Sequence, residues 1–165
     1  MLKLSATLSS KSLNDLLKQV GKYREKVENA GPKITRVLTE AGVSIAKDNA
    51  SYMNIYDSGE LVNGIVAEYV GAYGVETAKG KVHSTARHSA FCEFGTGVVG
   101  KGSQHPDPMP GWVYDVNEHG EDGWWYYDDQ GEKRWTKGMP SRPYMYDTAR
   151  MLRNMIEPVA KEVIK

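Results

Sequence analysis

The chain has 165 residues, with 21 basic and 21 acidic side chains, so its formal net charge is zero. This balance argues against a general binder of nucleic acids or membrane surfaces, which would carry a basic excess. The single cysteine excludes an intramolecular disulfide and a cysteine-rich zinc site. No apolar run approaches the roughly 20 residues of a membrane helix, and the first residues lack the apolar stretch of a secretory signal. We expect one soluble domain over residues 1–165, with no membrane segment and no sequence-specific nucleic-acid site.

The N-terminal third predicts a short strand followed by helix. Apolar and polar residues alternate over Leu2–Leu8, which is typical of a half-buried strand. Ser12 is suited to cap a helix, and apolar residues recur at helical spacing over 13–27 and again over 34–51. Pro32 either separates two helices or kinks one long helix, and the sequence leaves both alternatives open.

The middle of the chain predicts a small antiparallel sheet. Residues 61–70 and 74–83 are rich in strand-forming residues and are joined by the turn sequence Gly71-Ala72-Tyr73-Gly74. A compact apolar group, Ala90–Phe94, follows. Residues 95–111 have no periodicity and are rich in Gly and Pro, so we expect a long loop there.

The last third predicts a hairpin and a helix. An aromatic hairpin is predicted from two aromatic-rich segments that flank a polar turn, Trp124–Tyr127 and Glu132–Trp135. Apolar residues spaced by threes and fours over 145–163 predict a C-terminal helix, which Pro158 kinks or weakens. The expected fold is α+β: an N-terminal strand and long helices packed on a small antiparallel sheet, with a C-terminal helix. A protruding aromatic loop and hairpin is inserted at about 97–141.

The glycine-rich segment Gly95–Gly102 nearly matches two phosphate-binding motifs, the dinucleotide fingerprint and the P-loop. Both motifs bind phosphate because a helix N-terminus follows the glycines. Here Gly102 replaces the P-loop Ser or Thr, and the next residues, 103–108, contain two prolines that do not suit a helix start. We therefore expect a flexible loop and no nucleotide cofactor.

The polar residues suggest neither a metal site nor a catalytic group. No pair of histidines has the spacing of a helical zinc site; the four are His83, His88, His105 and His119. Cys92 lies in the apolar group, where a free cysteine usually acts as a small buried hydrophobe. Asp128 and Asp129 are adjacent and fit a turn better than an acid–base pair. The chain is therefore not expected to be an enzyme.

The aromatic hairpin has two possible interpretations. Residues 124–131 resemble one unit of the wall-binding repeats that hold choline between Trp and Tyr rings. Those modules occur in tandem and this chain has one copy, so cross-strand aromatic pairs that stabilise an exposed hairpin are the simpler interpretation. A glycan- or choline-type binding module remains the alternative.

Charge is unevenly distributed along the neutral chain. Residues 1–50 carry nine Lys or Arg and five acids, whereas residues 112–136 carry seven acids and two basic residues. Such asymmetry suits two surfaces that meet different neighbours. The candidate interface residues are Trp124, Trp125, Tyr126, Asp128, Asp129 and Glu132.

Two segments in this order resemble a known family. They are His88–Thr96, with its Phe-Cys-Glu-Phe-Gly-Thr core, and Lys137–Ala149, with Arg-Pro-Tyr-Met. The pattern resembles the small tail-component family of tailed bacteriophages, the lambdoid "gene ten product" family, similar in role to the minor tail protein Z of lambda. Ser58–Leu61 is similar to that family's turn into its first central strand, and 112–135 to an insertion in some members. The family-motif residues are Phe91, Glu93, Phe94, Gly95, Thr96, Arg142, Pro143, Tyr144 and Met145.

The resemblance implies a structural virion protein made in the bacterial cytoplasm. Members of the family act at the head-proximal end of the tail, in tail completion or head–tail joining. The resemblance further implies a homo-oligomeric ring, with a hexamer favoured, that contacts other neck and tail proteins. A tail terminator of the same assembly is the alternative role. No catalytic, cofactor or metal residue is implied.

The motif residues also have expected structural roles. We expect Phe91 and Phe94 to be buried and to anchor the sheet against the helices. Glu93 should be exposed on the opposite face or paired with an arginine, Arg142 or Arg87. Gly95 should end a strand in a conformation that a Cβ atom would hinder. Pro143 should occupy the first position of the last helix.

Overall fold

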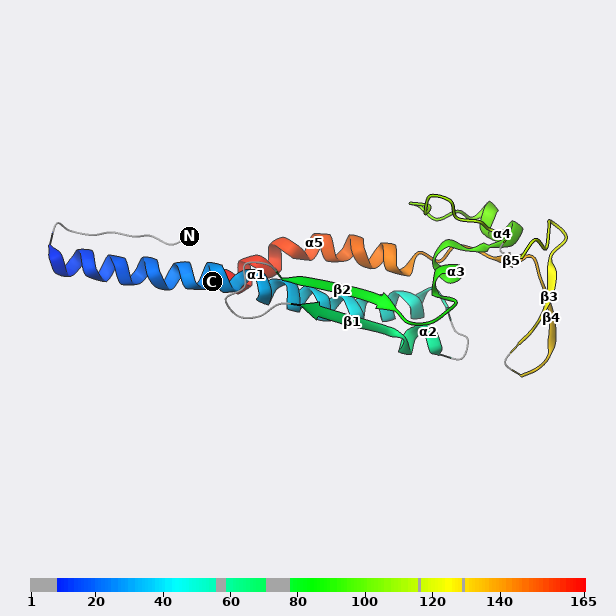
Figure 1. The fold of residues 1–165 in the computed structure, drawn as a ribbon, viewed down its shortest axis with the longest axis horizontal. Helices are drawn as coiled ribbons and strands as arrows, with labels where there is room; N and C mark the ends of the chain where they lie inside the picture. The colour runs from blue at the N-terminus through cyan, green and yellow to red at the C-terminus, as the bar shows by residue number, and fades with distance from the viewer. Residues whose placement is uncertain (1–8, 56–58, 71–77, 116, 129) are drawn as a thin grey trace.

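The structure is a computed structural model that describes residues 9–55, 59–70, 78–115, 117–128 and 130–165. Its architecture is the predicted α+β fold, with a long N-terminal and a C-terminal helix packed together and two antiparallel two-stranded sheets (Figure 1). The predicted strand Leu2–Leu8, the turn Gly71–Gly74 and the interface candidate Asp129 lie outside the described residues.

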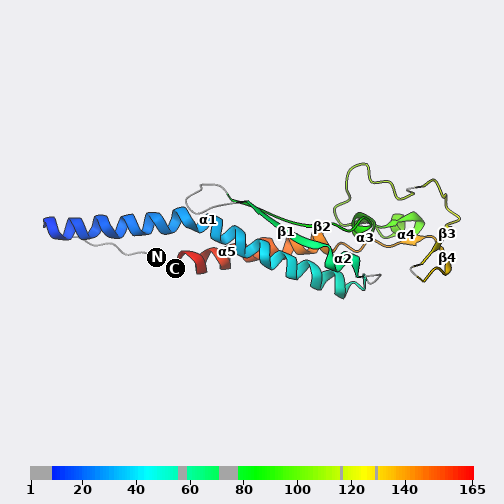
Figure 2. The ribbon, with the colours of Figure 1, turned by 60° about the horizontal axis from the view of Figure 1, so that its bottom comes forward.

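The first helix, α1 (Ser10–Tyr52), runs without interruption through Pro32, so the single long helix is the correct alternative. Figure 2 shows α1 changing direction about midway along its length, as a proline that removes one backbone hydrogen bond would produce. The N-cap is Ser9, whose hydroxyl accepts a hydrogen bond from the Ser12 N–H at 3.2 Å, rather than Ser12 itself.

The last helix, α5 (Tyr144–Ile164), packs against the second half of α1. Its C-terminal end lies beside the middle of α1, where Lys26 Nζ donates to the Lys165 carbonyl at 2.9 Å. The first half of α1 therefore projects beyond α5 (Figure 1). Among the described helices, none has a stretch long and apolar enough to cross a membrane.

The larger sheet lies over α1. Strands β1 (Ile65–Val70) and β2 (Lys79–Ser84) pair antiparallel, as predicted, with Tyr69 opposite Gly80. Gly80 lets β2 approach α1 closely, because a Cβ atom there would overlap the Thr39 hydroxyl. The predicted strand residues 61–63 instead form a short helix, α2 (Glu60–Asn63), since the Gly64 N–H bonds back to the Glu60 carbonyl.

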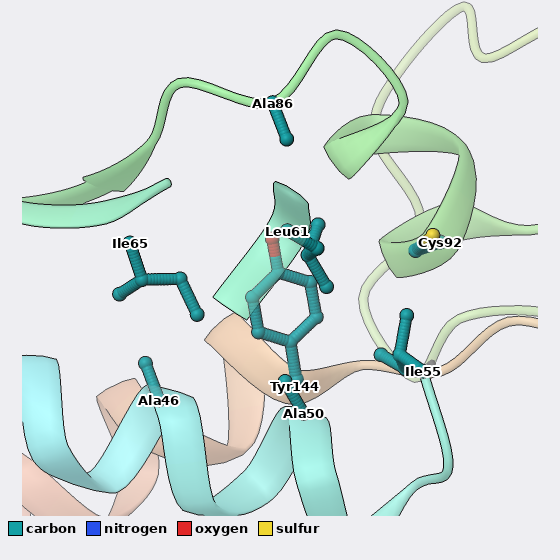
Figure 3. Packing of buried hydrophobic residues seen from close by; sticks show 8 residues of the cluster. All are labelled: Ala46, Ala50, Ile55, Leu61, Ile65, Ala86, Cys92 and Tyr144. Atoms are coloured by element: carbon teal, nitrogen blue, oxygen red, sulfur yellow. The ribbon is translucent and has the colours of Figure 1, made fainter. Parts of the chain in front are cut away.

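The core gathers where α1, α2, β1 and the start of α5 meet (Figure 3). Tyr144 lies at its centre and is 1% exposed. Two small residues of α1, Ala46 and Ala50, leave room for larger neighbours above them. The buried cluster consists of Ala46, Ala50, Ile55, Leu61, Ile65, Ala86, Cys92 and Tyr144.

The remaining elements are short, and they contribute Cys92 to the buried cluster. Helix α3 (Ser89–Phe94) contains the apolar group, and helix α4 (Gly97–Gly102) lies where a flexible loop was predicted. That prediction was wrong for 97–102 because tertiary contacts override the low helix propensity of glycine. The Gly97 N–H donates to the Tyr114 carbonyl at 2.7 Å, and a Cβ at Gly100 would lie 2.7 Å from the Gly95 carbonyl carbon.

The aromatic hairpin forms as predicted. Strands β3 (Trp124–Tyr127) and β4 (Lys133–Thr136) pair antiparallel, followed by the short strand β5 (Gly138–Met139). The hairpin lies at the opposite end of the molecule from the first half of α1 (Figure 1).

Candidate functional site

The structure brings the two motif segments into direct contact. We call this region the junction: residues 91–97, from α3 and the turn after it, and residues 138–146, from β5 and the start of α5. Antiparallel bridges join Thr96 to Met139 and Gly97 to Gly138. The Arg142 N–H donates to the Cys92 carbonyl at 2.9 Å. The junction is thus tied together largely through backbone groups.

Glu93 is the central side chain of the junction. It is buried, and its carboxylate caps α5 from outside that helix: Oε2 accepts from the Met145 N–H and Oε1 from the Tyr146 N–H, both at 2.9 Å. Those amides lie in the first turn of α5, where no intrahelical carbonyl is available, and a negative charge there also suits the helix dipole. The hydroxyl of Ser141 donates to the Glu93 carbonyl at 2.6 Å.

The side chain that pairs with Glu93 is His105, so both expectations for Glu93, exposure or pairing with Arg142 or Arg87, were wrong. His105 Nε2 lies 3.0 Å from Glu93 Oε1, and Nδ1 lies 3.0 Å from the Asp107 backbone nitrogen and 2.6 Å from its carbonyl oxygen. In the contact with Glu93 the ring Nε2–H is the donor, because a carboxylate only accepts hydrogen bonds. Sequence reasoning missed His105 because it lies in an aperiodic, proline-rich segment.

Phe91 and Phe94 do not anchor the sheet, contrary to expectation. Both are half-buried on the side of α3 away from the core, whereas Cys92 faces the core. Phe94 packs against His105 and Trp112, with ring centroids 4.7 and 5.1 Å apart, and Phe91 lies 5.9 Å from Trp112. The indole N–H of Trp112 donates to the Gly95 carbonyl at 3.0 Å. These rings cover the junction rather than the main core.

Gly95 has the conformation that was predicted, although it ends a helix rather than a strand. Its φ is 79° and its ψ is 165°, a region open essentially to glycine alone. A Cβ at this position would lie 2.7 Å from the Ser141 nitrogen. Pro143 is the N-cap of α5, one residue before the predicted position.

Tyr144 begins α5 and joins the junction to the core. Burial raises the pKa of its phenol to about 12; the nearby Glu93 charge adds to this effect and a hydrogen bond with Ser84 opposes it. The adjacent Met145 packs against the same core. The motif residues therefore act as one structural unit.

Two of the hairpin aromatics, Trp125 and Trp135, pack against each other. The Trp125 and Trp135 rings, on paired residues, meet edge to face at 5.2 Å, and Lys133 Nζ lies 5.0 Å from the centroid of Trp125. Trp124 is half-buried and lies 4.7 Å from the His119 ring, whereas Tyr126 is exposed. The cross-strand interpretation of the hairpin is confirmed for Trp125 and Trp135.

Asp128 holds the hairpin turn. Its Oδ1 accepts from the Gln130 and Glu132 N–H groups at 3.0 and 2.8 Å, and its Oδ2 lies 3.0 Å from Arg134 Nε. The Glu132 N–H, then Arg134 and Gln130, lower the pKa of Asp128 below its ordinary 3.8. The predicted turn role of Asp128 is confirmed, and the Glu132 side chain lies exposed beside it.

The remaining sequence candidates do not converge on a reactive centre. His83 and His88 pair with different carboxylates, Glu68 and Glu60. The part of the chain that the structure describes contains no group of three or more His, Cys, Asp or Glu side chains placed to hold a metal ion. The glycines at 95, 97 and 100 serve close backbone packing.

Comparison with known proteins finds no family model, no curated protein and no solved structure that matches this chain.

Proposed function

We propose that this chain is a structural virion protein of a tailed phage or prophage, acting at the head-proximal end of the tail in tail completion or head–tail joining. The observation that supports it most is that the motif residues make contacts within the chain. The carboxylate of Glu93 and the backbone of Gly95 and Arg142 all connect separate segments of the fold. Groups that are fully engaged in such contacts suit a scaffold rather than a catalytic or ligand-binding site.

The two ends of the molecule support a role in assembly. One end is the first half of α1, with exposed apolar side chains and several lysines. The other is the hairpin region, with exposed aromatic side chains and the acidic segment 112–136. In a ring built from head-to-tail contacts, each subunit presents unlike surfaces to its two neighbours. Opposite charges across such contacts guide orientation and association rate.

Electron microscopy of particles made without this gene tests the proposal. Loss of a joining or completion protein should leave filled heads and tails of normal length that do not assemble into virions. Overlong tails would instead assign the tail-terminator role. Normal numbers of intact, infectious particles would contradict any role in the neck.

The glycan- or choline-type binding module remains the less favoured alternative. Such a module needs open aromatic faces, whereas Trp125 contacts both Trp135 and Lys133. Saturable retention on a choline resin or a defined glycan, lost on Trp125→Ala, would favour this alternative over the neck.

A further inference from the structure

Strand β2 has an edge that can accept another strand. The sheet contains β1 and β2, paired from Ile65 opposite Ser84 to Val70 opposite Lys79. Among the described residues, no strand lies against the other edge of β2. The backbone N–H and C=O groups of such an edge are available to pair with an extended segment, the mode of recognition called β-augmentation.

An apolar groove of about 350 Å³ lies between α1, β2 and α5. The sheet packs mainly over α1, so a third strand beside β2 would continue the sheet layer over α5 (Figure 2). Two α5 residues in the groove, Ala149 and Ile156, are exposed in the single chain. The apolar lining consists of Leu38, Val82, Met145, Ala149, Leu152 and Ile156.

The segment Leu2–Leu8 has the pattern that this site requires. Its apolar residues are Leu2, Leu4, Ala6 and Leu8, with Lys3, Ser5 and Thr7 between them. In a strand, alternate side chains face opposite sides. An added strand of this sequence would direct its apolar residues at α5 and its polar residues at solvent. The outward face of β2 is polar in the same way, with Lys79, Lys81 and His83.

The segment cannot reach the groove of its own chain. Gly80 of β2 lies against Thr35 and Thr39 of α1, and the helix begins after its cap Ser9. From residue 9 to residue 35 an α-helix advances about 39 Å at its rise of about 1.5 Å per residue. Eight extended residues span at most about 29 Å. The site on β2 is therefore beyond the reach of residues 1–8 of the same chain.

We propose that residues 2–8 of one copy add as a third strand to the free edge of β2 in a second copy. The projecting half of α1 is then the arm that carries this strand to its neighbour. Its exposed side chains Leu13, Leu17 and Val20 lie next to the strand in sequence and become part of the same contact. The exchange concerns two copies of this chain and does not depend on the proposed role in a phage neck.

Paired double substitutions in the segment test the proposal. Leu4→Glu with Ala6→Glu places two charges on the apolar face, and Ser5→Glu with Thr7→Glu adds the same charge on the polar face. We expect the first variant to weaken self-association of the full chain roughly 100-fold, measured by sedimentation over a concentration series, because it would bury unpaired charges. The second should stay within about threefold of the wild type, as for an exposed substitution.

A cross-link identifies the partner surface. One mass-tagged chain carries Ala6→Cys and a second carries Ala149→Cys, while Cys92, which is buried, is retained. A flexible bifunctional maleimide added to the mixture should join one chain of each kind; unlike a disulfide, it does not require the two Cα atoms to lie within about 7 Å of each other. A wild-type chain that is monomeric up to about 100 µM, where even weak specific contacts are populated, would overturn the proposal. So would equal effects of the two double variants, or stable oligomers without the cross-link.

Discussion

Glu93 and Asp128 receive the same set of hydrogen bonds in two very different regions. Each carboxylate accepts two backbone N–H bonds and pairs with one basic side chain, His105 for Glu93 and Arg134 for Asp128. Glu93 is buried in the junction, whereas Asp128 is half-buried at the turn of the hairpin, next to exposed residues.

The difference lies in what the bonds connect. The partners of Asp128 are within six residues of it along the chain, so they fix one turn. The partners of Glu93 are 12, 52 and 53 residues away, and they hold separate elements together. The same chemistry should therefore control global stability in the junction and only local order in the hairpin.

The largest contrast is expected between two tyrosines. Tyr144→Ala removes a ring that is 1% exposed, and it should lower the free energy of unfolding by about 3–5 kcal/mol, as for other large aromatic truncations in cores. Tyr127→Ala removes a ring that is 71% exposed, and its effect should stay within about 0.5 kcal/mol. Denaturant unfolding of both variants measures the difference. Equal effects on the free energy of unfolding would mean that the hairpin contributes as much to global stability as the core does.

Alanine substitutions at two glycines compare the cost of backbone strain with the added cost of a steric clash. Gly95 and Gly131 have φ values of 79° and 77°, but a Cβ at Gly95 would meet the Ser141 nitrogen at 2.7 Å and a Cβ at Gly131 would meet nothing within 4 Å. Gly131→Ala should lower the free energy of unfolding by about 1 kcal/mol, from backbone strain alone. Gly95→Ala should lower it by about 3 kcal/mol, because the backbone must also shift to avoid the clash. Equal midpoints in chemical denaturation would show that the junction tolerates the added atom.

Neutralising the two carboxylates sharpens the comparison. Glu93→Gln should lower the free energy of unfolding by about 2 kcal/mol. Buried hydrogen bonds to a carboxylate are weakened or lost, and the new amide NH₂ group then faces an N–H donor. Asp128→Asn should leave the global unfolding midpoint unchanged and alter only the resonances of residues 127–134. Thermal unfolding with NMR spectra of the folded state measures both. A global loss from Asp128→Asn would contradict the local role of the turn.

A change of conditions rather than of sequence gives the last prediction, a dependence of stability on alkaline pH. Burial raises the pKa of Tyr144 in the folded chain to about 12 from its ordinary 10. The unfolded chain therefore releases the phenol proton first, so stability is complete below pH 10 and falls as the pH rises to 12. The slope should approach about 1.4 kcal/mol per pH unit over that window. Tyr144→Phe should remove this part of the slope, and an unchanged slope would contradict the assignment.

The sequence predicts the parts of the molecule whose contacts are local. The turn at Asp128 and the pairing of Trp125 with Trp135 follow from short-range patterns, and both form. The helical stripes on both sides of Pro32 were also visible, although the sequence alone left open whether one helix spans them. The hairpin half of the candidate site was in this sense predictable.

The junction was not predictable in detail. Nothing near Glu93 in the sequence marks His105 as its partner, and the arginines were the more obvious choice. Helix α4 contains glycines, which usually disfavour helix. They are needed there because the backbone around Gly138 comes so close that a Cβ atom at Gly97 would clash with it. The contacts between residues 91–97 and 138–146 depend on tertiary approach, which short-range patterns do not encode.

Hydrogen exchange in the native state tests the central contrast most directly. The Met145 and Tyr146 amides lie in the first helical turn of α5, where amides usually exchange quickly for lack of an intrahelical acceptor, and here both donate to Glu93. We predict that they exchange only on global unfolding, with an opening free energy equal to that of the whole chain. The Gln130 and Glu132 amides, which donate to Asp128, should exchange by local opening, at least roughly 100-fold faster. Equal exchange rates at the two sites would contradict the claim that the junction holds the fold together while the hairpin turn holds only itself.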